Sequence, residues 1–394
     1  MTDRHRSADG HRLVTPALVL VSLTLFLGAQ VPNVFVLSPR FLGDRGYHED
    51  EIGVIMGAFN IASLVVSPAI GWLCLRLGHA RVMAIGCVIA AAGAVRFAFA
   101  DDQLGFATGR ALQGFGFAGV LIGAAAYVAE SAPPERLGEA LGLAGVLTLA
   151  AQAVAPVVAA VLRDVSGWSA VWWFGAGAGL AGAAVAIALP TVTPHAGGDD
   201  GPRGPAAGPL AATVLAGVGF GAIWTFLADH GPRAGVEHVT PFFVAYVIAA
   251  ISVRLFLGRL SDRIGRRAAA APALVGHAVI LLGMAVLGAT WHLVVIGLVY
   301  GFCHGIYYPT LQALVVERSG GRRSRAVSAA TFAFGIGVTG AAFGLGPVAH
   351  AWGYPIIYVV AALCGAAGAA VVWWEPEDAK RPSAWPTAPP TSRS

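Results

Sequence analysis

The sequence predicts an all-α integral membrane protein with twelve transmembrane helices, and three observations support this prediction: scarce charge, abundant glycine and a series of long apolar runs. Of the 394 residues, 57% are hydrophobic and 12% are charged, whereas a soluble domain carries roughly 25% charged residues. The 52 glycines are typical of membrane helices, which pack closely at small residues. We therefore expect the lipid bilayer to surround most of this chain.

Twelve segments are long and apolar enough to cross a bilayer, which takes roughly 20 residues. They lie at 13–37, 51–74, 80–100, 104–128, 136–162, 168–190, 208–230, 240–260, 269–289, 291–315, 324–349 and 353–374. The first run continues well past the length of a signal peptide, so we expect it to be retained as a span.

The longest polar stretch between these runs, 191–207, separates six of them from the other six. The predicted organisation is a cytoplasmic tail at 1–12, a six-helix bundle at 13–190, a cytoplasmic linker at 191–207, a second six-helix bundle at 208–374 and a cytoplasmic tail at 375–394. With the N-terminus in the cytoplasm, 18 of the 25 basic residues lie on the inner side, five lie on the outer side and two lie within spans. This asymmetry follows the positive-inside rule.

An internal repeat relates the two sets of runs. Shifting the second set back by 187 residues aligns charged residues as well as glycines, which shared hydrophobicity alone would not do. The aligned pairs are Gly71 with Gly258, Arg76 with Arg263, Gly78 with Gly265, Gly114 with Gly301, Glu130 with Glu317 and Arg136 with Arg323. The repeat predicts two related halves that lie parallel in the membrane.

Two segments resemble motifs of the major facilitator superfamily (MFS). GRLSDRIGRR at 258–267 matches the signature loop between the eighth and ninth helices, and RALQG at 110–114 is similar to the fourth-helix pattern Arg-x-x-Gln-Gly. The first-half copy of the loop, GWLCLRLGHAR at 71–81, has Leu75 in place of the aspartate. The resemblance covers roughly 13–374 and implies the MFS fold, with two pseudo-symmetric six-helix bundles.

The two loop copies hold the candidate gate residues, which are Gly71, Arg76, Gly78, Arg81, Gly258, Asp262, Arg263, Gly265, Arg266 and Arg267. The resemblance implies that Asp262 and its arginines latch the two halves on the cytoplasmic side in one state and release them in the other. The alternative is that these residues only set topology. Gly265 would permit the tight turn between two spans.

Two acid and arginine pairs, Glu130 with Arg136 and Glu317 with Arg323, follow the fourth and tenth spans. They resemble the Glu/Arg pairs that clamp the cytoplasmic side of sugar porters and their relatives. The alternative is that Glu130 or Glu317 carries a coupling proton. Both residues lie at the interface and not in mid-membrane, which favours the clamp.

Arg110 lies about 9–10 Å below the outer surface at 1.5 Å per residue, and a charge inside the membrane is a functional hypothesis by default. Its side chain could instead extend to the headgroups, and the same holds for Arg254 near the inner end of its span. In the related transporters this arginine faces the central cavity. The candidate residues for the cavity or for coupling are Gln30, Asn33, Arg110, Gln113, Trp224, Asp229, Arg254, His304, Tyr307 and Tyr308.

The chain contains no Walker motif, no His-Glu-x-x-His and no Gly-x-Ser-x-Gly, so the sequence predicts neither ATP drive nor an enzyme, and no metal, cofactor or nucleic acid. We expect a monomeric, proton-coupled secondary transporter that exports a small organic molecule by alternating access. Uptake of a metabolite or organic anion, with Arg110 as counter-ion, and a non-transporting membrane sensor are the alternatives. The bias to Ala, Gly and Arg, with one lysine, indicates the inner membrane of a bacterium with a GC-rich genome.

Overall fold

The computed structural model describes residues 15–131, 137–192, 206–257, 260–318 and 323–374, and the regular structure of these residues is helical, without a strand. The elements are α1 (Pro16–Val34), η2 (Phe35–Leu37), α2 (Ser38–Gly43), α3 (Glu49–Leu77), α4 (His79–Ala98), α5 (Gln103–Ser131), α6 (Leu137–Ser166), α7 (Trp168–Ile187), α8 (Ala207–Arg233), α9 (Thr240–Phe256), α10 (Leu260–Ile264), α11 (Arg266–Ala285), α12 (Thr290–Arg318), α13 (Arg323–Trp352) and α14 (Tyr354–Trp374).

Each of the twelve apolar runs coincides with one long helix, which confirms the predicted all-α membrane fold. Eleven of these helices are long and apolar enough to cross a bilayer. The twelfth, α9, is apolar but has only 17 residues, or about 25 Å of helix. This length is at the lower limit for a span.

Several helices extend beyond the predicted limits. α3 begins at Glu49, and α5 and α12 end at Ser131 and Arg318, three residues past the runs that predicted them. The first turn of α3 is acidic at positions 49 to 51 and is capped by the His48 ring. Acidic residues are favourable in the first turn of a helix, but they are polar and therefore fall outside an apolar run. The predicted run for α3 was too short for this reason.

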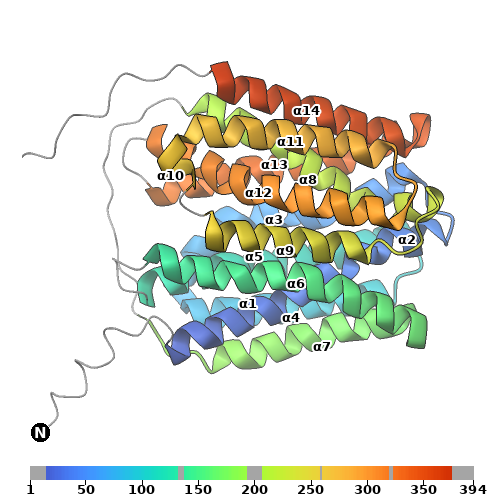
Figure 1. Ribbon diagram of the computed structural model, residues 1–394. Coiled ribbons are helices and arrows are strands. Elements are labelled where there is room, and N and C mark those ends of the chain that lie inside the picture. Colours follow the sequence, from blue (N-terminus) through green and yellow to red (C-terminus); the bar gives the residue numbers. More distant parts are fainter. Residues whose placement is uncertain (1–14, 132–136, 193–205, 258–259, 319–322, 375–394) are drawn as a thin grey trace, which may run out of the picture.

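The long helices run side by side, so the molecule has two ends (Figure 1). We call them the α2 end, where α3 and α5 begin, and the α10 end, where α1 begins and α14 stops. α1 to α7 form the first half and α8 to α14 the second half. Most close packing lies within a half, for example α4 on α5 and α12 on α9, and the main contacts between halves are α3 with α13 and α6 with α9.

The two halves repeat the same close helix contacts. A Cβ on Gly114 of α5 would lie 2.1 Å from the carbonyl oxygen of Phe59 in α3, and a Cβ on Gly301 of α12 would lie 2.2 Å from that of Tyr246 in α9. The two acceptor residues are separated by the same 187 positions as the two glycines. Gly265, which precedes α11, has a φ of +94°, close to the +83° of its repeat partner before α4, so both interhelical turns adopt a conformation that favours glycine.

Candidate functional site

A central cavity of about 160 Å³ lies between the two halves. Pockets that hold drug-sized ligands have volumes of roughly 300 Å³ or more, so in this conformation the cavity has room only for a smaller group. The lining mixes amide, aromatic and aliphatic side chains with one cation. It consists of Pro32, Asn33, Val36, Met56, Phe59, Asn60, Arg110, Phe117, Thr148 and Gln152 from the first half, and Phe220, Trp224, Thr225 and Val338 from the second.

Arg110 is the charged residue of the cavity lining, and its side chain is buried with 4% of its surface exposed. Its Nη1 donates to Oε1 of Gln113, one helical turn along α5. The guanidinium carbon lies 4.8 Å from the ring centre of Phe59 and 5.7 Å from that of Phe35, which stabilises the cation. Among the described residues no carboxylate pairs with it, so the cavity has an uncompensated positive charge.

Three of the predicted cavity residues, Asn33, Arg110 and Trp224, line the cavity, and a fourth, Gln113, holds Arg110. Trp224 stacks on Phe220 at 3.9 Å between ring centres. Gln30 is buried in α1 and is not among the lining residues, and neither of its amide atoms has a hydrogen-bond partner in the part of the chain that the structure describes.

His304, Tyr307 and Tyr308 lie outside the cavity lining, in an aromatic cluster of α9, α11 and α12, and His304 packs against Phe220 of the lining at 5.5 Å between ring centres. The Nδ1 atom of His304 is 2.9 Å from the hydroxyl of Tyr246. Arg254 is half-buried near the α10 end and contacts α6, because its Nη1 would be 3.2 Å from a Cβ on Gly145. These four residues are therefore not side by side with Arg110.

Asp229 belongs to a separate network at the α2 end, which joins the halves. Its Oδ2 accepts from the Tyr354 hydroxyl and lies 3.0 Å from Nη2 of Arg233. The Nη1 of Arg233 donates to Oε1 of Glu49 in the first half, at 2.6 Å. Oε2 of the same Glu49 is 3.4 Å from Nδ1 of His350 in α13. One carboxylate of α3 thus contacts two helices of the second half.

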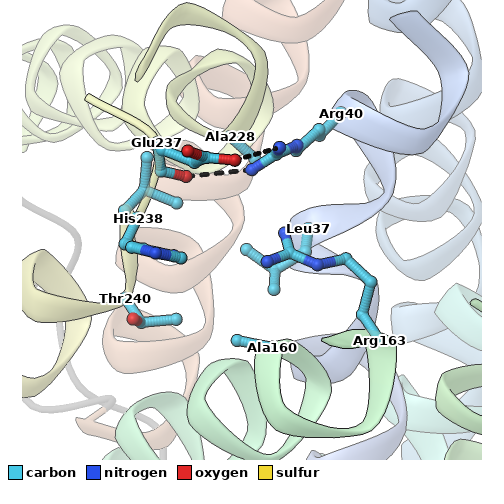
Figure 2. Close-up of a pocket in the computed structure, with 9 residues that line it drawn as sticks. Leu37, Arg40, Ala160, Arg163, Ala228, Glu237, His238 and Thr240 are labelled. Atoms are coloured by element: carbon cyan, nitrogen blue, oxygen red, sulfur yellow. Dashed lines mark hydrogen bonds and ion pairs between the residues drawn. The ribbon is translucent and has the colours of Figure 1, made fainter. Parts of the chain in front are cut away.

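A second link between the halves lies beside this network. Arg40 of α2 donates from Nη1 to the carbonyl oxygen of Glu237 at 2.9 Å and lies 3.3 Å from the Glu237 carboxylate (Figure 2). Arg163 and His238 line the same small pocket. Every ion pair between described residues of different halves is at the α2 end.

The sequence prediction missed Asn60, Gln152 and the cross-half pairs. Asn60 and Gln152 belong to α3 and α6, whereas the predicted cavity residues belong to α1, α5, α8, α9 and α12. The Asp229–Arg233 pair did have a signal, since residues four apart on a helix lie side by side. Nothing in the sequence connects Glu49 to Arg233, which are 184 residues apart.

The first-half loop copy lies at the α10 end, where α3 ends and α4 begins. Arg76 lies over the Trp72 ring at 4.8 Å, and Arg81 is exposed. Gly71 has open space around its Cα. These residues are therefore exposed or pack against a neighbour in their own helix, and their role in gating stays a prediction.

In the second-half copy, Arg266 donates to Glu317 and to the Ser261 hydroxyl, each at 3.0 Å. Arg267 lies over the Trp373 ring at 5.4 Å, and Arg263 is exposed. Gly258 lies outside the described residues. Asp262 is in α10, but its side chain lies outside the described part, so its latch role stays a prediction.

The predicted clamp pairs are only partly within the described structure. Glu130 lies 3.5 Å from Nε2 of the buried His79, and Glu317 pairs with Arg266. Arg136 and the side chain of Arg323 lie outside the described residues. Both glutamates have a described partner from their own half, and the clamp stays a prediction.

Long apolar helices in two halves around a buried polar cavity are the architecture of a membrane transport protein. The chain belongs to the Major Facilitator Superfamily, whose profile matches residues 18–339 and 211–391. The fold is similar to that of the nucleoside transporter NupG (TM-score 0.72, 13% identity, 90% of this chain and 98% of that one) and of the human organic anion transporter MFSD10 (TM-score 0.68, 16% identity, 91% and 100%).

Similar curated proteins include export proteins and a vesicular transporter. The mouse vesicular acetylcholine transporter is 32% identical over 134 residues, which are 34% of this chain and 25% of that protein. The multidrug export protein EmrB of Haemophilus influenzae is 23% identical over 168 residues (43% and 32%), and the staphylopine export protein of Staphylococcus aureus is 25% identical over 142 (36% and 35%). The chain spans a quarter to about a third of the length of these relatives.

Proposed function

We propose that this transporter exports a small organic molecule in exchange for protons, by alternating access of the central cavity to the two sides of a bacterial inner membrane. The α10 end faces the cytoplasm in this proposal, since most basic residues lie in the segments expected at that end. The similarity to multidrug and staphylopine export proteins supports the direction. The chain works as a monomer, with the cavity between its own halves.

The observation that carries the proposal is the closure at the α2 end, above a cavity lined by both halves. α3 and α13 touch there backbone to backbone, because a Cβ on Gly53 would lie 2.3 Å from the carbonyl oxygen of Ala342. The Arg233–Glu49 bridge lies at the same end. In the proposed orientation these contacts would separate the cavity from the outer side, as one state of alternating access requires.

Asp229 and Glu49 are the groups we assign to proton coupling. Both carboxylates are largely buried, and both contact Arg233. Proton binding to either one removes a negative partner of the guanidinium and weakens the bridge between the halves. A proton from the outer side would thereby favour opening of the α2 end, which releases cargo outward.

The test uses purified protein in proteoliposomes with an imposed pH gradient and a panel of fluorescent organic cations, zwitterions and anions. At least one compound should move only with the gradient. Asp229→Asn should abolish the gradient dependence, whereas Asp164→Asn should retain it, because Asp164 is at the same end but pairs with Arg163 on its own helix. Movement that ignores the gradient would reject proton coupling.

A second candidate function is the transport of an organic anion, which the uncompensated charge of Arg110 favours. The similarity in fold to a human organic anion transporter agrees with this candidate. The same panel separates the two functions: movement restricted to carboxylates or other anions supports the second, and movement of organic cations supports multidrug-type export.

A further inference from the structure

A group of three potential metal ligands lies at the α2 end, outside the central cavity. His48, Glu49 and His350 each offer one ligand atom, and these atoms lie within 4.8 Å of one another. We propose that this group binds one divalent transition-metal ion of the zinc type, and that the ion ties α3 to α13 and holds the α2 end closed. The proposal is independent of the cargo and of the direction of transport.

The fold brings the three residues together through a close helix contact. A Cβ on Gly346 of α13 would lie 2.9 Å from the carbonyl oxygen of Glu49 and from Cα of Asp50, so only a glycine lets α13 pass the start of α3 at this distance. His350 follows Gly346 by one helical turn and therefore lies over the first turn of α3. His48 is the N-cap of that helix, beside Glu49 in the sequence.

The spacing of two of the ligand atoms already suits a metal ion. Nδ1 of His350 is 3.4 Å from Oε2 of Glu49, and ligands at about 2.1 Å from a tetrahedral ion are separated by about 3.4 Å. The rings of His48 and His350 have centres 5.1 Å apart. His48 would have to approach by no more than about 1.4 Å, since no two of the three ligand atoms are more than 4.8 Å apart.

Both histidines can make this adjustment because they are exposed. The side chain of His350 is 52% exposed, and that of His48 is exposed as well. The His48 ring also accepts from the backbone N–H of Glu51, as part of a capping box at the start of α3. The ion would replace this N–H at the ring nitrogen, and the α3 cap would then rest on the Glu51 side chain, which accepts from the His48 N–H at 2.9 Å.

The ligand chemistry selects the kind of ion. Two imidazoles and one carboxylate are typical of zinc and related ions, whereas calcium and magnesium prefer oxygen ligands. Three protein ligands leave a fourth position for water. Among the described residues, the guanidinium in contact with the group is that of Arg233, on the other oxygen of Glu49, and Asp229 also pairs with it. With both carboxylates ionised, the acids outnumber this cation, so the site attracts a divalent ion.

The ion would join the two halves, because His48 and Glu49 precede and begin α3 of the first half, whereas His350 is in α13 of the second. The three ligands converge only while the α2 end is closed. An ion that binds one state alone shifts the population toward that state. The site would therefore act as a metal-sensitive brake on the cycle, and in the orientation of the proposed function the ion would come from the outer side.

The test is a calorimetric titration of the full-length protein with zinc chloride, after purification without a polyhistidine tag. One ion should bind, and His350→Ala should weaken its binding at least 10-fold, as expected when a ligand is lost. His48→Ala should also weaken it. His292→Ala is the matched control, since this residue is another histidine near the α2 end, in the first turn of α12, and should bind zinc as the native chain does. Absence of a zinc site in the native chain, or equal binding by His350→Ala, would overturn the proposal.

Hydrogen exchange measured by mass spectrometry shows whether the ion bridges the halves. Zinc should slow exchange in peptides from the start of α3 and from the end of α13 together, and this effect should be lost in His350→Ala. Protection of only one of the two peptides would contradict the bridge. The readout does not require knowledge of the cargo, so its failure is separate from a failure of the proposed function.

Discussion

α5 and α12 hold equivalent places in the two halves, but they offer the cavity different chemistry. Each packs against its neighbour through a glycine at the same position of the repeat, Gly114 or Gly301. Where α5 has Arg110, α12 has Gly297 at the equivalent position. Where α5 has Phe117, which lines the cavity, α12 has His304, which instead contacts Tyr246.

This difference shows that the repeat determines helix contacts and not the site. The glycine contacts depend on backbone geometry, which both halves share. The polar character of the cavity is one-sided: a buried cation with amide and aromatic neighbours faces it from α5, whereas the α12 cluster is hydrogen-bonded within its own half.

The largest effect is expected for Arg110→Met, which keeps the length of the side chain and removes its charge. Transport of the cargo found in the vesicle panel should fall about 10- to 100-fold, the equivalent of losing one charge-assisted hydrogen bond. The matched change in α12 is Tyr300→Phe, at the position equivalent to Gln113. Its hydroxyl lies beside that of Tyr307 and outside the cavity lining, so transport should stay within about twofold. Initial rates in proteoliposomes give both values.

Equal losses in Arg110→Met and Tyr300→Phe would contradict a one-sided site. Size-exclusion profiles of both variants provide the control for folding. If Arg110→Lys transports at the native rate, the loss in Arg110→Met is due to the missing charge. If Arg110→Lys is as slow as Arg110→Met, the geometry of the guanidinium is required.

The shared part of the comparison is tested by Gly114→Ala and Gly301→Ala. Each new Cβ would meet a backbone carbonyl oxygen at 2.1 or 2.2 Å, so the helices must move apart, and each change should lower the free energy of unfolding by about 1–3 kcal/mol. Gly177→Ala and Gly344→Ala are the controls, because no atom lies within 4 Å of their new Cβ. They should be neutral or stabilising by up to about 1 kcal/mol. Thermal unfolding in detergent compares all four variants. A loss of stability in only one of Gly114→Ala and Gly301→Ala would contradict the equivalence of the two helix contacts.

Much of this fold could be predicted from the sequence, because membrane spans and interhelical turns are local. The apolar runs located every long helix, and the repeat paired Gly78 with Gly265, which both have positive φ. Arg110 stood out because a charge within a span is rare. The direction in which a side chain faces is not local, since it depends on how each helix is rotated against its neighbours. His304 therefore shared the prediction for Arg110 but lies behind Phe220 of the lining and not in the lining itself.

The contacts between halves were the least predictable feature. Glu49 and His350 are separated by 301 residues, and neither forms a recognisable motif. Their meeting depends on the close approach of α3 and α13 at Gly346, which is a property of the closed α2 end. A sequence pattern describes one chain segment at a time, whereas a contact that forms in one conformation requires the arrangement of both halves.

The smallest effects are expected in stability, where the two helices should respond with opposite signs. Arg110→Met removes a buried cation that has no carboxylate partner among the described residues, so the free energy of unfolding should rise by about 1 kcal/mol. His304→Phe gives α12 the residue that α5 has at this position. It leaves the buried Tyr246 hydroxyl without its 2.9 Å partner, so the free energy of unfolding should fall by about 1 kcal/mol.

Melting temperatures of the two variants in the same detergent distinguish these signs. His304→Gln serves as the control for volume, because its amide can still accept from Tyr246 and should recover most of the loss. A lower melting temperature for Arg110→Met would mean that the cation is compensated after all, and the anion-binding candidate would lose its physical basis. Opposite signs would show that α5 keeps a destabilising charge that α12 lacks. A site that binds cargo can require such a charge at a cost in stability, whereas a packing cluster does not.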